Sequence, residues 1–197
     1  MSSETYTLTA SAEEGEALDL LIRRAQEGDA AAFEEILSRF EGKALSIALN
    51  LGASRADAED IAQDAFLKLF RHIGAYRGGR RFTAWFYRIV INAARDHLEK
   101  QRSASGSRQA SGSETERGRL EPRSSGADPA AESERREQIR RALLSLSVRE
   151  REVVILKELH GLSTWEVALI LRLNPITVRR HAMQARARLR ELLGDHR

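Results

Sequence analysis

The sequence predicts an all-α protein in which two small helical domains are joined by a flexible linker. Apolar residues recur at spacings of three and four along residues 16–101 and again along 131–193. Between these segments, residues 102–130 are rich in Ser, Gly and Arg and too poor in apolar residues to offset the entropy lost on ordering. We found no β-hairpin signal and no internal repeat.

Glycines and capping residues divide the N-terminal helical segment into about four helices. Gly28 followed by Asp29 predicts the end of one helix and the cap of the next, and Gly52 followed by Ser54 predicts the same. Gly74, with the glycines at 78 and 79, marks a loop before a last helix that begins near Phe82. We expect residues 1–15, which are polar and acidic, to form a loose tail. The expected divisions are therefore 1–15, 16–101, 102–130 and 131–197.

The composition excludes several classes of protein. With 42% apolar and 31% charged residues, the chain is too apolar to be wholly disordered. It contains no cysteine, so disulfides, zinc–thiolate sites and thiol redox sensing are excluded. No apolar run is long enough to span a bilayer, and the first residues do not form a signal peptide. We expect a cytoplasmic protein without membrane association, metal or cofactor.

The charge is divided unevenly along the chain. Residues 1–75 hold 7 Lys and Arg against 14 Asp and Glu, whereas residues 76–197 hold 25 against 15, so net charges of −7 and +10 lie within the total of +3. An acidic front half and a basic back half indicate two different partners, of which the second is expected to be nucleic acid. Solvated helix faces explain the composition equally well.

Residues 161–189 have the pattern of a helix-turn-helix. Ser147 with Glu150, and Ser163 with Glu166, form capping boxes, and Asn174 followed by Pro175 predicts an N-cap with proline at the first helical position. A short helix over about 164–171, a three-residue turn and a longer helix from 175 follow from these signals. Arg172 occupies the turn position where glycine is common, which predicts a positive φ.

The longer helix presents polar side chains that suit DNA. Val178, Ala182, Ala185 and Leu189 repeat at helical spacing as its inner face. Guanidinium and amide groups, which match major-groove edges and phosphates, lie outside or at the edges of that face. These candidate DNA-binding residues are Thr177, Arg179, Arg180, His181, Gln184 and Arg186. A solvated basic helix is the alternative, and the coincidence of caps, turn and basic face favours DNA.

Two helices of the N-terminal domain carry further candidate surfaces. The segment 57–71 is amphipathic, with Ile61, Ala65 and Leu69, and beside them Ala62, Phe66 and Phe70, forming its apolar face. The segment 82–100 and the loop before it interleave aromatic and basic side chains, a combination that can stack bases and hold a single-stranded backbone. Trp85 and Tyr87 are also explained as core residues, and for Trp85 alone the core is favoured.

These motifs resemble the extracytoplasmic-function (ECF) group of bacterial RNA polymerase sigma factors. GLSTWEVALILRLNPITVRRHAMQARARLREL resembles sigma region 4.2, and ALLSLSVREREVVILKELHG resembles region 4.1. DAEDIAQDAFLKLFR resembles region 2.2, and FTAWFYRIVINAARDHL is similar to regions 2.3 and 2.4. The resemblance covers about residues 16–101 and 131–193. It implies a region 2 helical bundle and a region 4 helix-turn-helix.

The resemblance also implies partners and roles. Core polymerase would be contacted through its β′ clamp helices and β flap. Asp60, Gln63, Asp64 and Lys68 would face the polymerase. The melted minus-ten strand would be held by Tyr76, Arg77, Arg80, Arg81, Trp85, Arg88, Asn92 and Asp96. The residues of the helix-turn-helix would read the double-stranded minus-thirty-five element. An anti-sigma factor is a further implied partner, and we expect the free protein to be a monomer.

Two other classes of function fit less well. No phosphate-binding loop, nucleophile elbow or zinc-protease motif is present, and the five histidines are scattered, so we do not expect an enzyme. A one-component helix-turn-helix regulator would explain the C-terminal domain but would leave the helices at 57–71 and 82–100 without a role.

Overall fold

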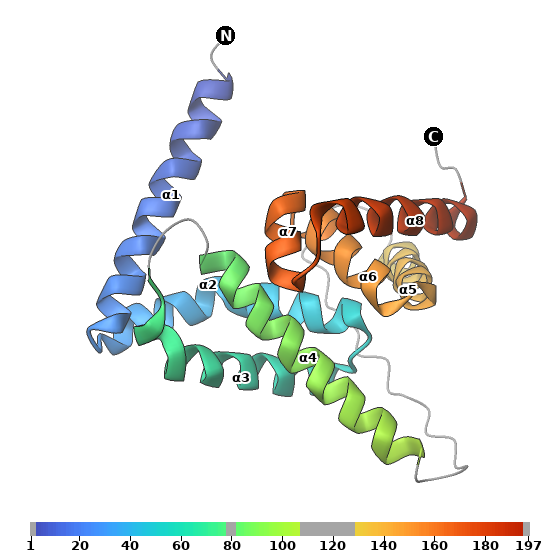
Figure 1. The fold of residues 1–197 in the computed structure, drawn as a ribbon, viewed down its shortest axis with the longest axis horizontal. Helices are drawn as coiled ribbons and strands as arrows, with labels where there is room; N and C mark the ends of the chain where they lie inside the picture. The colour runs from blue at the N-terminus through green and yellow to red at the C-terminus, as the bar shows by residue number, and fades with distance from the viewer. Residues whose placement is uncertain (1–2, 78–81, 107–128, 195–197) are drawn as a thin grey trace.

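The computed structural model describes residues 3–77, 82–106 and 129–194, and every regular element in these ranges is helical. The N-terminal domain contains α1 (Ser3–Gln26), α2 (Ala30–Leu51), α3 (Arg55–His72), the short η1 (Ile73–Ala75) and α4 (Phe82–Gly106). The C-terminal domain contains α5 (Pro129–Ser145), α6 (Val148–Val154), η2 (Ile155–Leu159), α7 (Thr164–Leu171) and α8 (Pro175–Leu193), as Figure 1 shows. The predicted all-α fold with two helical domains is confirmed.

The boundaries between α1, α2 and α3 follow the predicted capping signals. Asp29 accepts a hydrogen bond from the amide of Ala32 at the start of α2. Gly52 ends this helix at φ 110°, a left-handed conformation that glycine adopts without strain. Ser54 then caps α3 by accepting from the amide of Asp57. These two helix boundaries are therefore determined by local sequence signals.

Two helix ends differ from the expected divisions. Residues 1–15 were expected to form a loose tail, but α1 begins at Ser3 and runs without interruption to Gln26 (Figure 1). This stretch contains no proline to interrupt the helix. The linker was expected over 102–130, but α4 continues to Gly106 and α5 begins at Pro129. The rest of the expected linker, 107–128, lies outside the described residues.

A cluster of phenylalanines forms the centre of the N-terminal domain. Phe40 of α2 makes edge-to-face contacts with Phe82 and Phe86 of α4, with ring centroids 5.4 and 5.1 Å apart. Phe66 of α3 stacks on Phe86 at 5.2 Å. Because aromatic pairs in these geometries add to the free energy gained from burial, the cluster fixes α2, α3 and α4 relative to one another.

The C-terminal domain is built around a helix-turn-helix with a short helical layer beneath it. Both predicted capping boxes are present, Ser147 with Glu150 at α6 and Ser163 with Glu166 at α7. Val167, Ile170 and Leu171 of α7 are buried, as are Val178, Ala182 and Ala185 of α8. Helical periodicity assigned Val178, Ala182 and Ala185 to the inner face of α8, which is confirmed, whereas Leu189 of the same predicted set is half-buried.

The two domains pack against each other. Helix α4 lies on α7, and α2 contacts α5, α6 and η2. Figure 1 shows α7 between the N-terminal helices and α8. One continuous cluster of buried apolar residues includes Ile36 and Ile91 on one side and Ile155, Leu156 and Val167 on the other. The sequence predicted two domains on a tether but did not predict this docking.

The start of α3 is joined to α4 by hydrogen bonds to the carboxylate of Asp57. These bonds predict that the stability of the protein depends on pH. Asp57 accepts hydrogen bonds from Ser54 at 2.5 Å and from Gln101 at 2.6 Å, and it contacts His97 at 2.8 Å. The hydrogen bond from Ser54, followed by those from Gln101 and His97, lowers the pKa of Asp57 from 3.8 to about 2.

Because this folded-state pKa is depressed, the stabilisation by Asp57 is present above pH 3.8 and is lost as the pH falls towards 2. We expect Asp57→Asn to unfold at lower urea than the wild type at pH 6, with the difference narrowing as the pH falls. Urea titrations of both proteins between pH 6 and about pH 2 measure this difference in stability. A difference that does not depend on pH would contradict the assignment.

Candidate nucleic-acid and partner-binding surfaces

The helix-turn-helix has the predicted layout. Ser163 caps the start of α7, which ends at Leu171 with Arg172 as its C-cap, and Asn174 caps α8 by accepting from the amide of Ile176. Arg172 adopts φ 55° and ψ 47°, so the predicted positive φ at this position is confirmed. Its amide donates to the carbonyl of Ala168 and closes the end of α7. The left-handed turn of a non-glycine residue costs about 1 kcal/mol, which the packing of the two helices offsets.

The outer face of α8 presents most of the predicted DNA-binding side chains. Arg179, Arg180 and Gln184 are exposed, and Thr177 is half-buried. His181 is also half-buried, and its Nδ1 atom has no hydrogen-bond partner among the described residues. Arg186 is exposed but its guanidinium is 2.6 Å from the carboxylate of Glu158. The structure thus groups Thr177, Arg179, Arg180 and Gln184 as free polar groups and gives Arg186 a protein partner.

The same domain exposes apolar side chains that the sequence analysis did not single out. Trp165 and Leu169 lie one turn apart on α7 with exposed fractions of 71% and 46%, and Ile176 at the start of α8 is 72% exposed. The signal was available, since Trp165 and Leu169 fall off the face that Val167, Ile170 and Leu171 define.

Helix α3 presents the predicted polar face to solvent. Asp60, Gln63 and Asp64 are exposed and Lys68 is half-buried. Lys68 pairs with Asp64 at 2.8 Å, and its ammonium lies 3.8 Å from Asp96 of α4. The polar faces of α3 and α4 are therefore adjacent at Lys68.

One residue of the predicted apolar face of α3 lies elsewhere. Phe70 was grouped with Ile61, Ala65 and Leu69, but its exposed fraction is 64%. It packs edge-to-face on Phe33 of α2 at 5.2 Å, on the outside of the domain. The reason is the width of this face: α2 and α4, which pack against α3, do not bury all six of the apolar residues assigned to it.

Helix α4 carries a stripe of polar side chains beside a pair of stacked rings. Asn92 and Asp96 are exposed and Arg88 is half-buried. Trp85 is half-buried and stacks on Tyr76 with ring centroids 5.1 Å apart. The prediction that Trp85 belongs to the core is therefore only partly right, whereas Tyr87 is buried as a core residue would be.

The loop before α4 is held by a side chain of α1. Gln26 donates to the carbonyls of Ile73 and Tyr76 at 2.8 and 2.7 Å. Arg77 is exposed next to this anchor, whereas Arg80 and Arg81 of the predicted set lie outside the described residues. Rings, guanidinium groups and an amide on one helix and its preceding loop can stack bases and bind phosphates.

Comparison with known proteins identifies this arrangement. The family models of Sigma-70 region 2 and of Sigma-70, region 4 match residues 36–104 and 136–189. The chain is 32% identical over 171 residues to the ECF RNA polymerase sigma-E factor of Escherichia coli K12, covering 85% of this chain and 89% of that protein. The sigma-E factor of Salmonella typhimurium LT2 matches with the same identity and coverage. The chain belongs to the ECF group of RNA polymerase sigma factors.

As an ECF sigma factor, the chain binds core RNA polymerase and directs it to promoters, which a one-component regulator would not do. Solved structures support the fold of the whole chain. CnrH, in complex with the cytosolic domain of CnrY, superposes with a TM-score of 0.67 at 27% identity, covering 91% of this chain and 99% of CnrH. The sigma factor RpoE of Bartonella quintana, in complex with the anti-sigma factor NepR, has the same TM-score at 24% identity and shows the same fold.

Within the described ranges, this sigma factor has no helix long and apolar enough to cross a membrane. Nor do residues 3–77, 82–106 and 129–194 bring three His, Asp or Glu side chains together in a way that could hold a metal ion.

Proposed function

We propose that this sigma factor divides polymerase binding and promoter recognition among three faces. The polar face of α3, formed by Asp60, Gln63, Asp64 and Lys68, docks on core polymerase. The face of α4 with the preceding loop holds the melted minus-ten strand, and α8 reads the minus-thirty-five element. The adjacency of the α3 and α4 faces at the contacts of Lys68 with Asp64 and Asp96 carries this proposal, since it places the melted strand beside the polymerase.

Polymerase binding through α3 is tested by reversing one charge. Asp64 is exposed and pairs with Lys68, so Asp64→Lys places a positive charge in the centre of the proposed face. We expect this variant to bind core polymerase at least about tenfold more weakly, because like charges in an interface cost more than 1 kcal/mol. Titration of labelled protein with core polymerase measures the affinity.

Glu35→Lys provides the matched control, because Glu35 is an exposed carboxylate on α2 that pairs with Arg39 in the same i, i+4 geometry. It should bind core polymerase like the wild type. If both variants bound core polymerase equally weakly, the loss of affinity would come from the change in net charge. The proposal that α3 binds the polymerase would then be wrong.

The face of α4 supplies the groups that an unstacked strand requires. The stacked pair of Tyr76 and Trp85 offers a platform for a base, and Arg77 and Arg88 offer cations for the backbone. Asn92 carries an amide that can bond the Watson–Crick edge of an extruded base. Arg80 and Arg81 join this set by sequence. The polymerase performs all catalysis, and the sigma factor contributes only binding.

Reading of the minus-thirty-five element is tested at Arg180, an exposed guanidinium on the outer face of α8. A good contact of arginine to guanine contributes about 1–3 kcal/mol of discrimination, so Arg180→Ala should weaken specific binding roughly 5- to 100-fold. Holoenzyme affinity for promoter fragments at a fixed salt concentration measures it. Arg190→Ala removes the same charge from the last turn of α8, and an equal loss in this control would indicate a general electrostatic effect.

The remaining roles are extended from the family. We propose that the β flap of the polymerase contacts the C-terminal domain, that the chain acts as a cytoplasmic monomer before it binds polymerase, and that a protein partner of the anti-sigma class controls it. The complex of CnrH with a domain of CnrY supports the existence of a protein partner.

A further inference from the structure

The buried interface between the two domains contains a charged pair. The Nε and Nη2 atoms of Arg95, on α4, donate to the two carboxylate oxygens of Glu152, on α6, at 2.5 and 2.7 Å. Glu152 has no exposed surface, and Arg149 of its own domain donates to it at 3.1 Å. The Arg95 side chain keeps 30% of its surface exposed. A carboxylate of the C-terminal domain thus forms a bidentate ion pair with a guanidinium of α4, the helix proposed to hold the melted strand.

Other polar contacts join the same two surfaces. Arg151 donates to the carbonyl of Leu51 at the end of α2 at 2.8 Å, and the hydroxyl of Tyr87 lies 3.3 Å from Nδ1 of His160. Buried charges and polar groups add little to stability compared with apolar packing. They do favour one arrangement of the two surfaces, because other arrangements would leave them buried without partners. The docked state is therefore a specific one, and the pair of Arg95 with Glu152 lies at its most charged point.

Arg95 belongs to the stripe of α4 that carries the candidate strand contacts. Trp85, Arg88, Asn92 and Arg95 follow one another at spacings of three, four and three, which places them along one side of the helix. Three of the four are free of the other domain's carboxylates, whereas Arg95 is held in a bidentate pair. A phosphate offers arginine the same two-oxygen geometry as a carboxylate. Glu152 therefore binds the guanidinium of Arg95 with the same two-oxygen geometry that a phosphate of the strand would use.

The docked domains cannot read both promoter elements at once. Elements centred at minus ten and minus thirty-five are about 25 base pairs apart, or roughly 85 Å at 3.4 Å per pair. Helices α4 and α8 both pack on α7, which puts their axes within roughly 20 Å of each other. Reading both elements requires the domains to separate, and separation takes Glu152 away from Arg95.

We propose that Glu152 substitutes for a phosphate of the melted strand. In the free sigma factor it holds Arg95 in the docked arrangement of the domains. In the open promoter complex the domains separate and Arg95 binds the backbone of the strand. Arg95 is thus an additional DNA-binding residue, and Glu152 is its intramolecular competitor. The inference rests on the proposed role of α4 in holding single-stranded DNA.

The test uses two variants that affect docking alike but DNA in opposite ways. Glu152→Gln keeps the shape of the side chain and removes its charge, and Arg95→Ala removes the guanidinium. Both should weaken docking, because each leaves one member of the pair at the interface without its opposite charge. With Arg95 freed, Glu152→Gln should bind an oligothymidine single strand about three- to tenfold more tightly than the wild type. Arg95→Ala should bind it more weakly and with a salt slope reduced by about 0.7, the value for one single-strand phosphate contact.

Docking is measured in the full-length chain. Because the sequence has no cysteine, Ser38→Cys and Glu191→Cys, both at exposed positions, can be spin-labelled to report the distance between α2 and α8. We expect a narrow distance distribution in the wild-type background and a broader, longer one in either variant. Arg149→Ala is the control, since it removes the other partner of Glu152 without touching α4, and it should stay docked.

A pair with only a structural role would shift strand binding in the same direction in both variants, and this result would overturn the inference. If Glu152→Gln does not fold, Glu152→Asp, which shortens the reach to Arg95, must show the same tighter binding. The double variant should bind like Arg95→Ala, because Glu152 acts only through Arg95. If the wild type binds neither the oligonucleotide nor core polymerase, the proposed function fails. If it binds both and Glu152→Gln does not alter strand binding, only the inference fails.

Discussion

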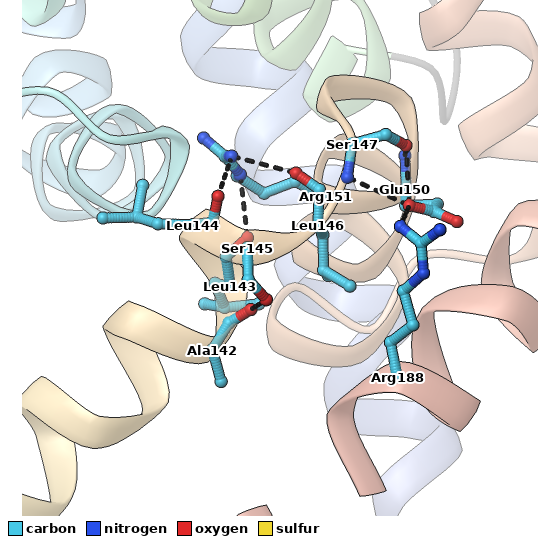
Figure 2. A network of polar contacts seen from close by, with 9 residues as sticks. All are labelled: Ala142, Leu143, Leu144, Ser145, Leu146, Ser147, Glu150, Arg151 and Arg188. Carbon is cyan, nitrogen blue, oxygen red and sulfur yellow. Dashed lines mark hydrogen bonds and ion pairs between the residues drawn. The ribbon is translucent and has the colours of Figure 1, made fainter. Parts of the chain in front are cut away.

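Replacing Arg151 by alanine is expected to lower the free energy of unfolding by about 3–4 kcal/mol, the largest effect of any single substitution considered. Figure 2 shows the guanidinium at the end of α5, where it donates to the carbonyls of Leu143, Leu144 and Leu146 at 2.9, 2.7 and 3.0 Å. A fourth bond reaches Leu51 of the other domain. The side chain is buried, and burial lowers the pKa of Arg151, although the group stays charged at neutral pH.

The size of this effect follows from what the substitution leaves behind. The last carbonyls of a helix have no partner within the helix, and Arg151 satisfies those of α5 and the end of α2 together. Alanine would leave several of them buried without a donor, each at a cost of about 1–3 kcal/mol less whatever water recovers.

Urea unfolding followed by circular dichroism measures this loss. Arg149→Ala, two residues earlier and half exposed, is the control and should cost under about 1 kcal/mol. Arg151→Lys keeps the charge but cannot reach all four carbonyls, so its stability should lie between the other two. A loss below about 1 kcal/mol for Arg151→Ala would show that water replaces the guanidinium without penalty.

Replacing Asn92 by alanine is expected to reduce open-complex formation roughly 10- to 100-fold while polymerase binding is unchanged. Asn92 is exposed on α4 and lies in the stripe with Arg88 and Trp85, so its amide is available to an unstacked base. Loss of a bidentate amide contact to a base corresponds to about 1–3 kcal/mol. Alanine is also a better helix former than asparagine, so the fold of α4 should not suffer.

Permanganate reactivity of thymines in the minus-ten region, measured with saturating holoenzyme, reports the melted strand. Glu99→Ala, another exposed polar residue two turns further along α4, is the matched control and should melt the promoter like the wild type. Wild-type reactivity in Asn92→Ala would remove this residue from the strand-holding face and leave the remainder of the stripe to be tested separately.

The candidate site was predictable wherever chemistry and helical spacing coincide on a single element. Arg179, Arg180 and Gln184 were assigned to the outer face of α8 because Val178, Ala182 and Ala185 occupy the inner one, and the structure places both sets as expected. Prediction failed where a second element decides the environment. Phe70 was grouped with the apolar face of α3 but packs on the surface against Phe33, and Arg186 is paired with Glu158 from an earlier helix.

The sequence by itself determined most of the helix boundaries, the helix caps and the family. Gly52, Ser54, Ser147, Ser163 and Asn174 set helix ends through hydrogen bonds to amides or backbone conformations within a few residues, and such local interactions need no knowledge of the fold. Even the unusual turn at Arg172 was determined in this way.

Only the tertiary structure decided how the two domains meet. The contact of Arg95 with Glu152 spans 57 residues and that of Arg151 with Leu51 spans 100. Gly52 has both a local and a tertiary requirement for glycine. Its positive φ is set locally, whereas a Cβ at this position would lie 2.9 Å from Leu144 of the other domain. Contacts at such separation depend on the relative positions of whole helices, which periodicity and capping do not specify. For this reason the sequence suggested which helix to propose for holding the strand, but not which carboxylate pairs with Arg95 of that helix.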